Sequence, residues 1–201
     1  VGAGHWGRNH IRTLFNLNAL GGVVEQDKET LKSIKSEYPN CKLHYKVEDA
    51  LNENYDGFIV ATPPLSHFEI AKLIIESNKP LLVEKPLTLN FQDANRLNEL
   101  AKQKNVNLMV GHILLFHPAF KKIKELIDKG MVGEIQYIYS NRLNLGTFRA
   151  DENVFWSFAP HDISLFNYFF EEDPIEISSR GVDILRKNIH DTTITSFKYD
   201  N

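Results

Sequence analysis

The stretch GAGHWG, residues 2 to 7, determines how the first half of the chain is interpreted. Its spacing, G-x-G-x-x-G, is typical of a tight turn that opens a helix and lets the backbone approach a diphosphate closely. The residues that follow, RNHIRTLFNL, have the pattern expected for that helix. We expect the strand that should precede the turn to lie upstream of Val1.

Such a turn also requires an acidic residue about twenty positions further on, at the end of the next strand. Glu25 closes the run GGVVE in that place, where its carboxylate can accept both ribose hydroxyls of an adenosine. The glycine motif alone could be an ordinary loop, but together with Glu25 it predicts a dinucleotide site. Because a carboxylate repels a 2′-phosphate, NAD is favoured over NADP, although Lys28 works in the opposite direction.

Short apolar runs alternate with helical patterns through the first half of the chain. The runs are GGVVE, DGFIVAT, PLLVE and VNLMVG, and the helical patterns cover residues 27–37, 66–77 and 91–104. This order predicts βαβ units, so we expect residues 1–111 to form an α/β domain with a doubly wound parallel sheet of the Rossmann type. Ser66 with Glu69 predicts a capping box, and Asn90 predicts a second helix start.

After Gly111 the pattern changes. We predict a helix over residues 118–129, a strand in EIQYIYSNRLNL (134–145), a short helix from about Pro160 to Phe170, and two further strands. Residues 112–201 are therefore expected to form an α+β domain with a mainly antiparallel sheet, truncated at its C-terminal end. A cleft is expected at the tight junction between the two domains.

The composition is that of an ordinary globular domain. The chain has 42% apolar residues, 24% charged residues and a formal charge of -3, which gives no basic footprint for nucleic acid. No apolar stretch is long enough to span a membrane, and no secretory signal is visible, so we expect a cytoplasmic protein. With Cys41 as the single cysteine, an internal disulfide is excluded and a reducing compartment is favoured.

Three segments occur together in this chain, GAGHWG, IVATPPLSHFEIA and LLVEKPL. The combination resembles the Gfo/Idh/MocA family of NAD(P)-dependent sugar and polyol dehydrogenases, and its E-K-P element is the most specific part. The resemblance implies an open sheet in the second domain whose outer face pairs subunits, hence a dimer or tetramer. A looser likeness, through NLGTFR and NVFWSFAPHDIS, is to members that oxidise nucleotide sugars for surface polysaccharides.

Together the turn, the acid and the resemblance imply a set of cofactor-binding residues, in which the loop after Thr62 crosses the cofactor. The set is Gly2, Gly4, His5, Trp6, Gly7, Glu25, Thr62, Pro63, His67, Glu84 and Lys85. His67 is also expected to pack within the helix that follows the loop.

Lys85 follows a continuous apolar run, at the strand end where parallel sheets bind their ligands. A solvated lysine that merely closes the strand is the alternative. The resemblance implies that Lys85 touches the reacting hydroxyl and that the Lys85–Pro86 peptide is cis. A fixed ammonium would stabilise the negative charge that develops on the oxygen as a hydride leaves.

The resemblance also implies a histidine base about seventy residues later, and SFAPHDIS offers His161. Family members usually read D-x-x-x-H, whereas this chain has Ser157 at the aspartate's position, so that role is lost or is taken by Asp162. If the helix begins after Pro160, backbone dipoles at its start would keep His161 neutral and ready to accept a proton. The alternative is that His161 and Asp162 only cap the helix.

Other polar residues remain second-tier candidates. His112 and His117 could suggest a metal, but no third ligand with sensible spacing is present, so we expect no metal and keep His117 as a candidate for substrate contact. A polar cluster could clamp a carboxylate or diphosphate, or could be solvated. It consists of Asn141, Arg142, Asn144 and Arg149.

The sequence thus predicts an NAD-dependent oxidoreductase that transfers a hydride between nicotinamide and a hydroxyl of a sugar or nucleotide sugar, with surface polysaccharide biosynthesis as the more specific expectation. The alternative is a non-catalytic, dinucleotide-binding regulatory protein, which the missing aspartate would permit.

Overall fold

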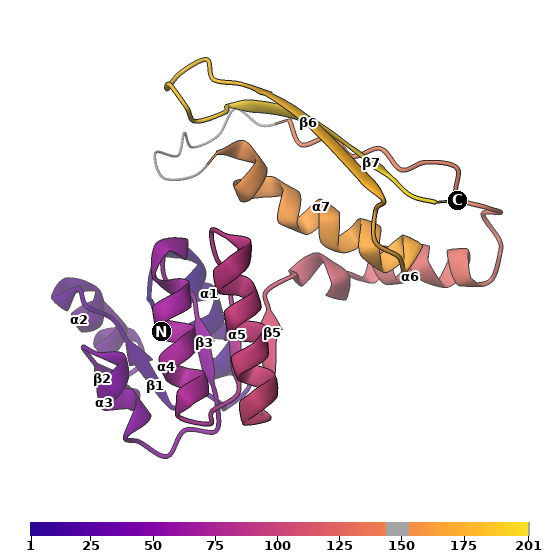
Figure 1. Ribbon diagram of the computed structural model, residues 1–201. Coiled ribbons are helices and arrows are strands. Elements are labelled where there is room, and N and C mark those ends of the chain that lie inside the picture. Colours follow the sequence, from indigo (N-terminus) through magenta and orange to yellow (C-terminus); the bar gives the residue numbers. More distant parts are fainter. Residues whose placement is uncertain (144–152, 201) are drawn as a thin grey trace. The chain divides into compact units, whose positions relative to one another are not determined.

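The computed structural model describes residues 1–143 and 153–200, and the chain divides into two compact units, Val1–Gly111 and His112–Asn201 (Figure 1). The first unit alternates strands and helices. Its strands are β1 (Gly22–Val24), β2 (Lys42–His44), β3 (Phe58–Val60), β4 (Leu81–Val83) and β5 (Leu108–Val110). Its helices are α1 (His5–Asn16), α2 (Lys28–Glu37), α3 (Val47–Leu51), the 3-10 turn η1 (Pro64–Ser66), α4 (His67–Glu76) and α5 (Phe91–Lys104).

All strand pairs in the first unit are parallel, with β1 beside β2 and the order β3-β4-β5 in a second group. Successive side chains of a strand point to opposite faces of the sheet, and β1 illustrates the consequence. Val23 packs with Ile11 and Ile34, from α1 and α2, whereas Val24 belongs to a separate cluster with Ile74 of α4. Helices therefore cover both faces, which confirms the predicted doubly wound Rossmann sheet.

The start of the chain lies between the two groups of strands. The amino group of Val1 donates to Ile59 O at 2.6 Å, and Gly2 N donates to Val24 O at 2.8 Å. The first residues thereby join β3 to β1 at their carboxyl ends. A cavity of about 860 Å³ lies between β1 and β3, and its walls include Val23 of β1 and Phe58 of β3.

Side chains cap two of the helices in the first unit, Asp27 at the start of α2 and Asn90 at the start of α5. Asn90 accepts a hydrogen bond from Asp93 N at 2.8 Å, as predicted for α5. The capping box predicted at Ser66 is wrong, because the Ser66 hydroxyl donates to Thr62 Oγ1 and Pro63 O at 2.8 Å instead. The prolines of this loop form the turn η1, and the hydroxyl is used to close that turn.

The second unit contains helices and one antiparallel pair of strands. These are η2 (Ile113–Phe116), α6 (Pro118–Asp128), α7 (Val154–Phe170), β6 (Glu176–Val182) and β7 (Thr192–Lys198). β6 and β7 pair from Glu176 opposite Lys198 to Val182 opposite Thr192, and Phe197 contacts Phe166 of α7 with ring centroids 6.1 Å apart. The antiparallel sheet predicted for this part of the chain is confirmed.

Two predictions for the second unit are wrong. The helix predicted from Pro160 begins at Val154, because Asn153 caps it by accepting from Trp156 N, and Pro160 lies inside it. Residues 134–143 of the predicted strand are not a strand in the structure. Large apolar side chains occupy alternate positions of this segment, as in a strand. However, no strand in the described ranges pairs with it, and Tyr137 and Tyr139 are 82% and 76% exposed.

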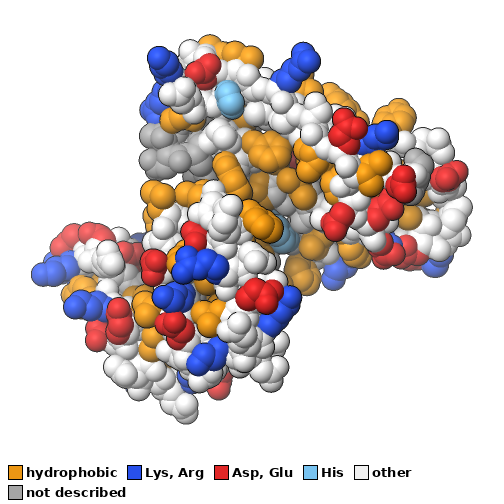
Figure 2. Space-filling view, viewed as in Figure 1, with side chains coloured by type: hydrophobic (Ala, Val, Ile, Leu, Met, Phe, Trp, Pro, Cys, Tyr) orange, Lys and Arg blue, Asp and Glu red, His pale blue; other side chains and the backbone are white. Residues whose placement is uncertain are grey.

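Charged side chains of both signs are interspersed on the visible surface (Figure 2), in keeping with the formal charge of -3. Among residues 1–143 and 153–200, no helix combines the length and the apolar character needed to cross a membrane.

Candidate functional site

The glycine turn has the shape that the motif predicts. Gly2 has φ +86°, and a Cβ there would lie 2.8 Å from Ala61 O. A Cβ at Gly7 would lie 2.0 Å from Gly2 O, so the turn can close against α1 only with glycine at this position. A Cβ at Gly4 would meet nothing within 4 Å, so the backbone at the start of α1 faces open space.

The N-terminus of α1 has the features of an anion-binding helix end. Gly4 is its N-cap, and no side chain caps the first N–H groups. No acidic residue lies in the first turn, where Trp6 is 48% exposed. Free backbone N–H groups and the helix dipole both favour a negatively charged group such as a diphosphate at this position.

Glu25 lies directly beyond β1 and is held beside the turn by backbone donors. Its Oε2 accepts from Ala3 N at 2.8 Å, and its Oε1 accepts from Gln26 N at 2.7 Å and Asp27 N at 3.0 Å. Oε1 therefore already accepts two hydrogen bonds, and Oε2 keeps a lone pair for a further donor. A fixed carboxylate next to an open glycine turn fits the adenosine ribose and diphosphate of a dinucleotide.

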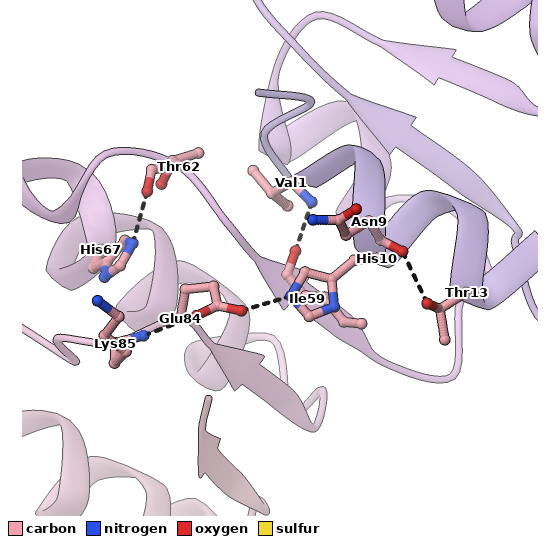
Figure 3. Close-up of polar contacts among 9 residues, drawn as sticks. All are labelled: Val1, Asn9, His10, Thr13, Ile59, Thr62, His67, Glu84 and Lys85. Atoms are coloured by element: carbon pink, nitrogen blue, oxygen red, sulfur yellow. Dashed lines mark hydrogen bonds and ion pairs between the residues drawn. The ribbon is translucent and has the colours of Figure 1, made fainter. Parts of the chain in front are cut away.

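The loops after β3 and β4 also lie at the carboxyl edge of the sheet. Thr62 and Pro63 follow β3, and Glu84 and Lys85 follow β4, whose Lys85–Pro86 peptide is cis. His67 is 1% exposed, with Nε2 2.9 Å from Thr62 O and Nδ1 2.9 Å from Pro86 O (Figure 3). His67 therefore lies between the two loops and contacts a carbonyl oxygen of each, and a direct contact with the cofactor stays a prediction.

Glu84 is the most buried carboxylate near Lys85, with 9% of its surface exposed. His10 Nε2 lies 2.7 Å from Glu84 Oε1, and Lys85 N donates to Glu84 Oε2 at 3.2 Å (Figure 3). Burial raises the pKa of Glu84, but the hydrogen bond from His10 and the charges nearby outweigh burial and leave the pKa below its usual value. The Glu84 side chain is thus an anion with both oxygens engaged.

His161 lies in the second unit, in the middle of α7, and is half-buried. The predicted effect of a helix start on its protonation is therefore wrong, because the dipole effect is confined to the first turn. Ser157 is buried one turn earlier, so Ser157 and His161 share a helix face as the aspartate and histidine of D-x-x-x-H would.

Asp162 points toward other partners. Its Oδ1 accepts from Ser140 Oγ at 2.9 Å and its Oδ2 accepts from Arg142 Nε at 2.7 Å. These bonds attach residues 140–142 to α7, and a role of Asp162, Asn141 or Arg142 toward a substrate stays a prediction. The predicted candidates Asn144 and Arg149 lie outside the described residues.

His117 is the N-cap of α6, and its Nδ1 accepts from Ala119 N at 3.2 Å. This contact is the helix-capping role of a junction histidine; contact with a substrate stays a prediction. Within the described ranges, no three histidine, cysteine or acidic side chains are grouped so that they could hold a metal ion.

Comparison with known proteins agrees with this geometry. The model of the Gfo/Idh/MocA oxidoreductase family, which is described by its NAD-binding Rossmann fold, matches residues 1–112. The chain belongs to this family. The NAD-binding Rossmann fold of the Gfo/Idh/MocA family is therefore assigned to the first unit, as the sequence predicted.

Named relatives include two kinds of dehydrogenase. A UDP-N-acetylglucosamine 3-dehydrogenase of Acidithiobacillus ferrooxidans is 28% identical over 183 residues, which cover 90% of this chain and 56% of that protein. An inositol 2-dehydrogenase of Corynebacterium glutamicum is 27% identical over 140 residues, covering 67% of this chain and 42% of that protein. The chain spans about half the length of these curated relatives.

Solved structures show the same fold. The structure of the Acidithiobacillus ferrooxidans enzyme superposes with a TM-score of 0.85 at 26% identity, covering 96% of this chain and 62% of that one. The structure of scyllo-inositol dehydrogenase from Lactobacillus casei with bound NAD(H) and scyllo-inositol has a TM-score of 0.76 at 16% identity, over 92% of this chain and 59% of that one. This second likeness concerns the fold alone.

Sequence reasoning missed His10. It lies three residues after Gly7, on the face of α1 that carries that glycine against the turn, and its partner Glu84 is 74 residues away. A pair so distant in sequence cannot be found from local patterns, although a histidine so close to the glycine motif was a visible signal.

Proposed function

We propose that this chain forms the NAD-binding unit and part of the substrate unit of a dehydrogenase that oxidises a hydroxyl of a sugar or nucleotide sugar. The observation that supports this most directly is the position of Lys85. It follows β4 at the edge of the sheet that also carries the glycine turn and Glu25, and Glu84 fixes its backbone N–H. A ligand at that edge would meet a dinucleotide site and an ammonium group together.

The proposed chemistry assigns a separate task to each residue. Bound NAD supplies the acceptor for the hydride. Glu25 accepts a ribose hydroxyl, and the Lys85 ammonium stabilises the negative charge on the substrate oxygen as its C–H bond breaks. His161 accepts the hydroxyl proton as the carbonyl forms. Lys85 and His161 belong to different units, so their convergence is part of the proposal.

NAD is the proposed cofactor in preference to NADP. Three backbone N–H groups, of Ala3, Gln26 and Asp27, hold the Glu25 carboxylate in place. The position left on Oε2 suits a ribose hydroxyl, and the negative charge repels a 2′-phosphate.

The substrate class is proposed from the named relatives, one of which acts on a UDP-sugar and another on inositol. A nucleotide-sugar substrate, and with it a role in surface polysaccharide biosynthesis, is the more specific proposal. We also propose that the enzyme acts in the cytoplasm, because its single cysteine suits a reducing compartment.

A homo-oligomer is proposed from the β6–β7 sheet. Phe197 faces α7, so the opposite face of β7 carries Ile194, which is 78% exposed, and the pairing places Val182 of β6 on that same outer face. Exposed apolar side chains on a sheet face are typical of protein contacts. Sedimentation of the chain, compared with an Ile194→Asp variant, tests this interface.

The function is tested by NADH formation with a panel of polyols, sugars and UDP-sugars. We expect one member of the panel to be oxidised, and Lys85→Ala to abolish turnover while the affinity for NAD stays nearly unchanged. Loss of NAD binding with turnover retained would contradict the assignment of Lys85.

A regulatory, non-catalytic dinucleotide-binding protein is the second candidate, and Ser157 is the observation that favours it. A buried serine stands where family members carry an aspartate. NAD binding without oxidation of any panel member would support this candidate over the enzyme.

A further inference from the structure

A histidine contacts the residue on each side of Lys85, and Figure 3 shows the one on the Glu84 side. On one side His10 contacts Glu84, whose second oxygen accepts the Lys85 N–H. On the other side His67 contacts the carbonyl oxygen of Pro86. The two histidines come from different helices, α1 and α4, so the Lys85 segment is tied to both.

The direction of the His10 contact follows from charge. The lowered pKa of Glu84 means that the side chain is a carboxylate, which can only accept hydrogen bonds. His10 Nε2 must therefore carry a proton and donate it across the 2.7 Å contact. The helix α1 that begins at the glycine turn thus fixes the carboxylate, and the carboxylate fixes the backbone of Lys85.

The Glu84 carboxylate leaves no room for a side chain at position 111. A Cβ at Gly111 would lie 2.9 Å from Glu84 Oε2, so a larger residue there would push the carboxylate away. His10 and Glu84 side chains are 22% and 12% exposed. Partly buried polar pairs of this kind add little net stability, because desolvation offsets their attraction, and apolar side chains could fill the same space. The geometry that the pair enforces is therefore its main contribution.

We propose that His10 and His67 are positioning residues for Lys85, His10 acting through the Glu84 carboxylate and His67 through the Pro86 carbonyl. A lysine has a flexible four-carbon stem, and a catalytic group must be held within about 0.5 Å of its working position. Fixing the backbone on both sides of Lys85 limits where its ammonium can go. The inference rests on the proposed function, because it gives Lys85 a substrate oxygen to meet.

The test uses the full chain and four variants. His10→Ala removes the donor, and His10→Gln returns an N–H near the same position. His67→Leu removes both ring nitrogens, and leucine is chosen instead of alanine because His67 is 1% exposed and a cavity there could prevent folding. The control is His44→Ala, because the His44 side chain contacts Tyr55 Oη at 2.9 Å and only its backbone carbonyl, which the substitution keeps, meets Glu25 N.

Three measurements apply to every variant: the dissociation constant of NAD, the melting temperature, and the ¹³C signal of reductively methylated Lys85, which is assigned with Lys85→Arg. Turnover is added for whichever panel substrate is oxidised. We expect the Lys85 signal to shift or broaden in His10→Ala and His67→Leu, to return toward the original in His10→Gln, and to stay unchanged in His44→Ala. With NAD affinity within about twofold, kcat should fall roughly 10- to 100-fold in His10→Ala and His67→Leu.

An unchanged Lys85 signal in His10→Ala would overturn the inference. So would a loss of NAD affinity that parallels a loss of thermal stability, because that result describes a purely structural role. If no panel substrate is oxidised by the unmodified chain, the proposed function fails, and the Lys85 signal still decides whether the two histidines position that residue.

Discussion

The carboxylate of Glu25 accepts the backbone N–H of Ala3 at 2.8 Å, which ties the end of β1 to the middle of the glycine turn. The same side chain thus serves the turn and faces the proposed ribose position. Stability and cofactor affinity should therefore both depend on Glu25. Removal of its negative charge should lower the affinity for the cofactor more than it lowers stability.

Replacing Glu25 by glutamine keeps an oxygen for Ala3 N and removes the charge, but it turns an NH2 group toward the N–H groups of Gln26 and Asp27, so some stability is lost as well. Hydrogen bonds to charged groups contribute roughly 1.5–3 kcal/mol, so we expect the dissociation constant of NAD to rise at least about tenfold in Glu25→Gln. NADP should bind relatively better, since the repulsion of its phosphate is gone. Calorimetric titration with both cofactors measures this, with Glu29→Gln on the exposed face of α2 as the control. Equal NAD affinity in the two variants would refute the role of Glu25.

The glycine turn predicts opposite outcomes for two alanine substitutions. Gly7→Ala places a Cβ 2.0 Å from Gly2 O, so it should cost more than about 3 kcal/mol of stability or prevent folding. Gly4→Ala meets no atom within 4 Å and should melt like the unmodified chain, yet bind NAD more weakly, because its methyl group enters the proposed diphosphate space. A Gly4→Ala variant with normal NAD affinity would place the diphosphate elsewhere.

Much of the first unit followed from local pattern. Apolar runs such as Leu81–Val83 need burial on both faces, and only a parallel sheet with helices on each side provides it. Asn90 was readable as a cap because its partner Asp93 is three residues away. Glu25 was readable because its spacing from the turn is fixed by one helix and one strand.

The failures concern contacts that local pattern does not contain. The sequence predicts a helix from about Pro160, but the Asn153 cap lies earlier and the helix contains the proline. Residues 134–143 alternate like a strand, yet strands need a partner, and pairing is decided far along the chain. The His10 and Glu84 pair was hidden for the same reason.

In the second unit, we predict that replacing Lys124 of α6 lowers stability more than replacing the exposed Lys129. Its Nζ lies 2.5 Å from Asp128 Oδ1 and 2.8 Å from Glu171 Oε1 at the end of α7, and its side chain is 10% exposed. Hydrogen bonds to these two carboxylates raise its pKa. We expect Lys124→Ala to cost about 1–2 kcal/mol through the lost bonds and packing.

The control for Lys124 is Lys129→Ala. Lys129 pairs with Glu125 on the surface, with 61% of its side chain exposed, and such a pair contributes little. Thermal melts of both variants, followed by circular dichroism, should separate them clearly. Equal melting temperatures would show that Lys124 does not hold α6 to α7.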